Sequence, residues 1–174
     1  RMHQAFEGCS KFNQQLDLSN LNLNDGALEG TFGNCKSLTY TPILPSNYTG
    51  RLNETFQDTK ITTAPILPDG VTSLNNTFRD CSELTTVGNI PSACNNYNGT
   101  FWGCTKLTSV PEEGWNGNME STFRDCNLLN QRIVINSASN LSFTFRECSS
   151  LSITPTLPEV VEGSMDSCFH SCSN

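Results

Sequence analysis

The sequence predicts an α/β repeat solenoid, with one parallel β-sheet on one face and short helical or irregular turns on the other. Three observations predict it: a phenylalanine recurs along the 174 residues, a similar residue pattern follows most copies, and the interval stays between 22 and 26 residues. An internal repeat of this length is typical of solenoids. The recurring residues are Phe6, Phe32, Phe56, Phe78, Phe101, Phe123, Phe145 and Phe169.

The repeats indicate one continuous array. A unit of about 23 residues is too short to enclose its own core, so each copy must be sealed by its neighbours. We therefore expect residues 1–174 to form a single array of about seven to eight units. Met2 precedes Phe6 by four residues, as Leu28 precedes Phe32, so the chain starts inside a unit. We expect the chain to be a piece of a longer array.

The segment that leads into each phenylalanine predicts a helical turn. Over residues 71–78, Val71, Leu74 and Phe78 occupy positions i, i+3 and i+7, which lie on one face of a helix. A cysteine usually follows three residues after the phenylalanine, and a leucine three residues after that. The predicted core ladder consists of Phe32, Phe56, Phe78, Phe101, Phe123, Phe145, Cys35, Cys81, Cys104, Cys126 and Cys148.

The residues after the ladder leucine predict a short strand. Residues 84–87, Leu-Thr-Thr-Val, favour β-structure but are too few to stand alone, so they must pair with copies in adjacent units. Because side chains alternate across a strand, the residue after the leucine should point outward. The outward row is either a ligand-binding face or a set of solvent-tolerant β-formers. The members of the row are Thr39, Thr62, Thr85, Thr108 and Ser152, and the candidate binding face adds their neighbours Tyr40, Thr86 and Ser109.

The nine cysteines allow three interpretations: a disulfide framework, a metal site or buried thiols. Buried reduced thiols are favoured, because the ladder has an odd number of members and Thr59 replaces one of them. A zinc site is not expected, because the sequence has no Cys-x-x-Cys and no paired histidines. Cys94 and Cys168 lie off the ladder and are expected to be exposed or bridged, with a Cys168–Cys172 disulfide as one option.

Composition excludes several classes of function. The net charge of −7 argues against nucleic acid, whose phosphates need lysine and arginine. No apolar run approaches the roughly 18 residues of a membrane-spanning helix. His3 and His170 lie at opposite ends of the array, and no phosphate loop, dinucleotide motif or nucleophile elbow occurs. We therefore expect no enzyme activity, no cofactor, no metal and no membrane insertion in this segment.

The repeated phrase, for example Thr77-Phe78-Arg79-Asp80-Cys81-Ser82-Glu83-Leu84, resembles the BspA-like leucine-rich repeat family. It is close to the Treponema-type variant with its Ala-Phe-x-x-Cys-x-x-Leu phrase. The first unit, residues 5–20, also resembles the Mycoplasma-type surface-protein repeat, which runs Met-Phe-x-x-Cys-x-x-Phe-Asn-x-x-Leu. The resemblance covers essentially the whole chain and implies a leucine-rich-repeat solenoid. Thr59 and the proline-free unit after Cys126 depart from the family pattern.

The resemblance also implies a secreted or cell-surface protein that serves in adhesion or ligand binding. We predict an extracellular, non-enzymatic binding protein that recognises a protein or glycan ligand on a host or matrix surface. It would use many weak polar contacts on the solenoid face, with avidity from repetition. The alternative is a structural array, such as a fibre, a spacer or a viral shell or tail component, that packs against copies of itself.

Overall fold

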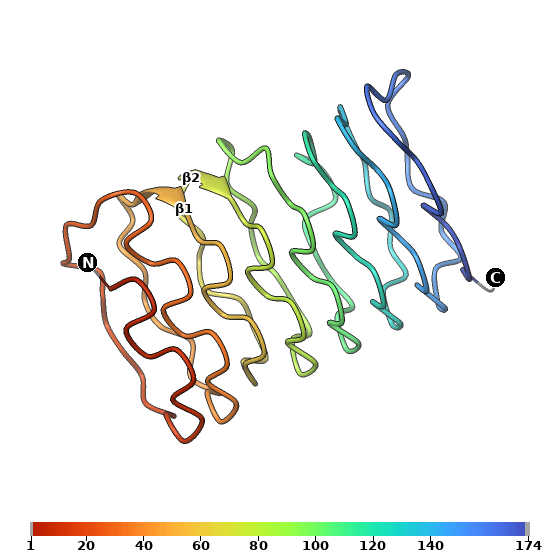
Figure 1. The fold of residues 1–174 in the computed structure, drawn as a ribbon. Coiled ribbons are helices and arrows are strands. Elements are labelled where there is room, and N and C mark those ends of the chain that lie inside the picture. The colour runs from red at the N-terminus through yellow and green to blue at the C-terminus, as the bar shows by residue number, and fades with distance from the viewer. Residues whose placement is uncertain (1, 173–174) are drawn as a thin grey trace.

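The computed structural model describes residues 2–172, and the chain winds into a solenoid of stacked coils. The coils follow one another from the red N-terminal end to the blue C-terminal end (Figure 1). Each coil places one phenylalanine in a continuous internal stack. From Phe6 to Phe169 the neighbouring rings are nearly parallel, with centroids 5.4 to 5.7 Å apart. The coils therefore stack with a short, regular rise.

Within residues 2–172, regular β-structure is limited to two short strands. Strands β1 (Thr49–Arg51) and β2 (Gly70–Ser73) pair in parallel. Elsewhere isolated parallel bridges join the coils, for example from Thr63 to Thr86 and from Thr86 to Ser109. The continuous sheet predicted after the ladder leucines is thus reduced to single bridges. The two strands instead precede the phenylalanines, in a segment where we expected a helical turn.

Residues 2–172 contain no helix, so the helical turn predicted over residues 71–78 is wrong. The segment after β2 is a series of tight turns, in which Asn76 and Asp80 have positive φ angles of 51° and 60°. Some N–H groups bond three residues back, whereas that of Phe78 donates to Thr100 O in the next coil at 2.9 Å. Packed helices need about 8–10 Å between axes. The 5.6 Å ring spacing between Phe78 and Phe101 leaves no room for them.

The core is built from ladders of equivalent residues. All eleven phenylalanines and cysteines of the predicted ladder have 0 % exposed surface. Each of these thiols donates a hydrogen bond to the phenylalanine carbonyl of the preceding coil, as Cys104 Sγ does to Phe78 O at 3.0 Å. The hydroxyl of Thr59 stands in the Cys position and donates to Phe56 O at 2.9 Å. The ladder therefore uses its sulfur atoms as hydrogen-bond donors.

A second polar ladder was missed in the sequence. A fully buried threonine stands directly before each of the six ladder phenylalanines, and its hydroxyl reaches a backbone carbonyl of the preceding coil. Thr55 Oγ1, for instance, lies 2.9 Å from Leu28 O and 2.7 Å from Leu52 O. Buried hydroxyl groups need such partners. The members are Thr31, Thr55, Thr77, Thr100, Thr122 and Thr144.

The prediction that Cys94 and Cys168 are exposed or bridged is wrong. They have 1 % and 4 % exposed surface, and all nine cysteines are free. Cys94 ends a turn that starts at Pro91, just as Tyr48 and Val71 end turns that start at proline, and all three side chains point inward. Cys168 precedes Phe169 and so occupies the position of a ladder threonine. The Cys168–Cys172 bridge is also absent, because Cys172 Sγ donates to Phe145 O at 3.0 Å.

Candidate binding surfaces

The residues predicted as a binding face lie on the outside of the coils. Seven are exposed and Thr85 is half-buried. The hydroxyl of Thr85 donates to Thr62 O at 2.9 Å, and that of Thr108 donates to Thr85 O at 3.2 Å. The row therefore links neighbouring coils, while the oxygen lone pairs remain available on the outside. Tyr40, with 51 % exposed surface, is the largest apolar side chain among the eight.

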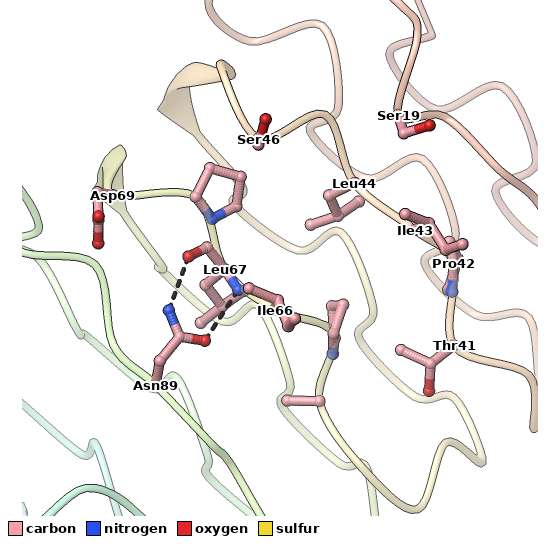
Figure 2. Close-up of a pocket in the computed structure, with 13 residues that line it drawn as sticks. Ser19, Thr41, Pro42, Ile43, Leu44, Ser46, Ile66, Leu67, Asp69 and Asn89 are labelled. Carbon is pink, nitrogen blue, oxygen red and sulfur yellow. Dashed lines mark hydrogen bonds between the residues drawn. The ribbon is translucent and has the colours of Figure 1, made fainter.

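A hollow of about 620 Å³ opens beside this row (Figure 2). It is lined by Ser19, residues 41–44, Ser46, residues 64–69 and Asn89, which come from successive coils. The exposed apolar side chains are Ile43, with 47 % exposed surface, and Ile66, with 85 %. Sequence analysis missed this site. The available signal was the Pro-Ile-Leu-Pro phrase that two consecutive units share.

One edge of the hollow is closed by a side-chain amide. Asn89 Oδ1 accepts a hydrogen bond from Leu67 N at 3.0 Å, and Asn89 Nδ2 donates to Leu67 O at 2.7 Å (Figure 2). The planar amide thus makes the two bonds that the backbone N–H and C=O of one residue make with an opposite residue in an antiparallel β-ladder. We call the backbone N–H and C=O of such a residue a rung, and the rung is filled when both groups are hydrogen-bonded to the next coil. Asn89 fills the Leu67 rung.

The equivalent rung one coil earlier is open. Ile66 occupies the position of Asn89 and Leu44 that of Leu67, 23 residues upstream. An isoleucine side chain has no amide. Within the described part of the chain, no hydrogen bond reaches the backbone N–H or C=O of Leu44. Because the Leu44 residue is buried, with 6 % exposed surface, the hollow combines an unfilled rung with an apolar wall.

A second surface feature is a stack of arginine and tryptophan. The guanidinium carbons of Arg79 and Arg124 lie 3.9 and 4.5 Å from the Trp102 ring centroid, within cation–π range. Trp102 Nε1 donates to Asp125 Oδ2 at 3.0 Å. Each arginine also has a carboxylate beside it. Arg79 Nε lies 3.4 Å from Asp80 Oδ2, and Arg124 Nε lies 3.6 Å from Asp125 Oδ2. The positive charges are thus balanced within the stack.

Asp125 and Glu147 form a carboxyl pair next to this stack. Burial raises the pKa of Asp125, and its hydrogen bond with Glu147 raises it further. The same hydrogen bond, together with Arg146, lowers the pKa of Glu147. The two carboxyl groups therefore titrate as a pair, in which the pKa of Asp125 is raised and that of Glu147 is lowered.

Residues 2–172 contain neither a candidate metal site nor a candidate membrane-spanning helix. No group of three or more His, Cys, Asp or Glu side chains in this range could hold a metal ion. The same range has no helix with the length and hydrophobicity that crossing a bilayer requires. The described surfaces are polar rows, an apolar hollow and charge-balanced stacks.

Stacked coils with inward ladders and polar outer rows define the class: a solenoid repeat protein. The chain belongs to the BspA-type leucine-rich repeat family, whose model matches residues 2–113 and 97–174 in six copies. This match confirms the resemblance in the repeated phrase. Repeats of this family are commonly parts of surface proteins, serve in protein binding and are in general non-catalytic. No curated protein and no solved structure matches the chain significantly.

Proposed function

We propose that the chain is the ligand-binding segment of a secreted or cell-surface adhesin and that it holds a protein ligand on the outside of its coils. The observation that carries this proposal is the hollow, where Ile66 leaves 85 % of its surface exposed beside an unfilled rung. Apolar surface rimmed by polar residues is typical of interaction sites. Its position between coils that are bonded to one another makes the site largely preformed.

The polar row supports the same function. Thr39, Thr62 and Thr108 are exposed, and the hydroxyls of Thr39 and Thr108 are already oriented by hydrogen bonds to Asn13 Oδ1 and to Thr85 O. A preformed surface loses little conformational entropy when it binds, so weak contacts add up more effectively. The row would supply many polar contacts and the hollow one apolar anchor. A glycan ligand would use the row rather than the hollow.

The test is binding of the purified chain to a panel of extracellular-matrix proteins and matrix glycans by biolayer interferometry. We expect saturable binding to at least one protein, weakened by Thr62→Glu together with Thr108→Glu. Val160→Glu, a change of a side chain with 72 % exposed surface, is the control and should bind like the unmodified chain. Absence of saturable binding across the panel, together with ordered self-association in light scattering, would favour the structural array instead.

A further inference from the structure

We propose that the hollow binds an extended segment of a partner protein. The backbone N–H and C=O of one residue of that segment would fill the Leu44 rung, and an aliphatic side chain would pack between Ile43 and Ile66. This inference rests on the proposed protein-binding function and specifies the chemistry of the ligand at one site.

The first argument is the precedent inside the molecule. One coil further on, the Asn89 amide already occupies the corresponding rung, with bonds of 3.0 and 2.7 Å to Leu67. The N–H and C=O of one extended residue offer the same donor and acceptor as a carboxamide. The Leu44 peptide groups therefore lie where the fold elsewhere accepts an amide.

The second argument is the surroundings of the open rung. Pro42, Pro65 and Pro68 line the hollow and have no N–H to offer. Backbone donors are consequently few. Leu44 lines the hollow together with these prolines, Ile43 and Ile66, and a hydrogen bond in a largely apolar setting is stronger than in water. An extended segment satisfies both requirements, because its amides and its side chains project in different directions.

The third argument is charge and aromatic content. Asp69 is the one charged residue among those that line the hollow, and the chain carries a net charge of −7. An acidic segment would be repelled, so we expect a neutral or basic one. The lining residues include no aromatic ring on which a sugar could stack. The chemistry therefore favours a peptide over a glycan at this position.

The test uses Ile66→Asn, which copies the amide that stands at Asn89. Because Ile66 is highly exposed, the substitution should preserve the fold and fill the Leu44 rung from within the chain. The control is Leu128→Asn, which replaces an apolar side chain with 51 % exposed surface outside the hollow. A random heptapeptide library displayed on phage is selected on the unmodified chain, and enriched peptides are titrated calorimetrically against all three proteins.

We expect enriched peptides with aliphatic residues and without acidic ones. Ile66→Asn should weaken their binding at least tenfold, and Leu128→Asn should leave it unchanged. N-methylation of the peptide amide that fills the rung should also weaken binding about tenfold, since it removes one hydrogen-bond donor. A melting temperature at or above that of the unmodified chain shows that Ile66→Asn is folded.

Three results would overturn the inference. No peptide is enriched; enriched peptides bind Ile66→Asn as tightly as the unmodified chain; or N-methylation at every position leaves binding unchanged. The proposed function has a separate readout. Saturable binding to a matrix protein that Ile66→Asn does not weaken would retain the adhesin function and exclude the hollow as its site.

Discussion

Single buried polar residues hold neighbouring coils together alongside the apolar core. Each ladder threonine and each ladder cysteine reaches a carbonyl in the coil before it, as Thr77 Oγ1 does to Leu52 O at 2.8 Å and Cys81 Sγ to Phe56 O at 2.9 Å. Burial raises the pKa of Cys81 to about 11, so its thiol keeps the proton that it donates. Loss of a buried hydrogen-bonding partner costs about 1–3 kcal/mol.

This arrangement predicts how the cysteines react with iodoacetamide at pH 8. The exposed Cys9 should be modified quickly in the folded chain. The six fully buried cysteines and Cys168 should react only after unfolding, because burial hides them and raises the pKa of Cys35, Cys81 and Cys168 to about 11. Mass spectrometry of the alkylated peptides measures this. Rapid modification of all nine cysteines in the folded chain would contradict it.

The threonine ladder makes a matched prediction. Thr77→Val keeps the side-chain shape but removes the hydroxyl that bonds Leu52 O, and it should lower the free energy of unfolding by about 1–2 kcal/mol. Thr108→Val removes an exposed hydroxyl and should change it by less than about 0.5 kcal/mol. Urea unfolding followed by circular dichroism gives both values. Equal effects would mean that burial of the hydroxyl does not matter.

Among the elements, the turns before and around the phenylalanines differ most from the sequence prediction. Leu74 and Phe78 were expected on one face of a helix, and both are buried, but consecutive tight turns bring them to the same side. Apolar spacing alone does not distinguish these backbones. The distinguishing signal was the recurrence of Gly, Asn or Asp two residues after the phenylalanine, since these residues tolerate positive φ; the examples are Gly8, Asn34, Asp58, Asp80, Gly103 and Asp125.

The turn geometry predicts the effect of substitution at Asn76. Asn76→Val should destabilise the chain by about 1–2 kcal/mol, because a β-branched residue is strained at a φ of 51°. Asn76→Gly should be nearly neutral, since glycine adopts positive φ freely. Thermal melting of the two variants distinguishes them. If valine and glycine have the same effect, backbone strain is not the cause.

The ladders were predictable from the sequence, whereas the hollow was not. The phenylalanine and cysteine positions follow from a fixed spacing, which the repeat preserves. The hollow depends on the difference between Ile66 and Asn89, and on whether a side chain reaches the backbone of the coil before it. That contact depends on how coils of unequal length align, which residue spacing does not specify.

At the scale of the whole molecule, each coil contacts the coils before and after it, so stability should be nearly a sum over coils and their interfaces. Removal of residues 79–101 joins Phe78 to Trp102 and restores the Phe-x-x-Cys phrase. The shortened chain should remain folded and cooperative, with a lower melting temperature. Removal of residues 79–90 cuts a coil in half and should abolish cooperative melting. A sharp melting transition in the chain that lacks residues 79–90 would contradict the expectation that each coil needs complete neighbouring coils.

The hydrogen bonds between coils have a mechanical consequence. Bonds such as Phe78 N to Thr100 O run from coil to coil along the stack. A force that separates the two ends of the array would therefore break these bonds one interface at a time, and the coils would detach in sequence from the ends. Each coil would release about 80 Å of chain for its roughly 23 residues. Under tension, such an array would lengthen in many small steps and absorb a pull gradually.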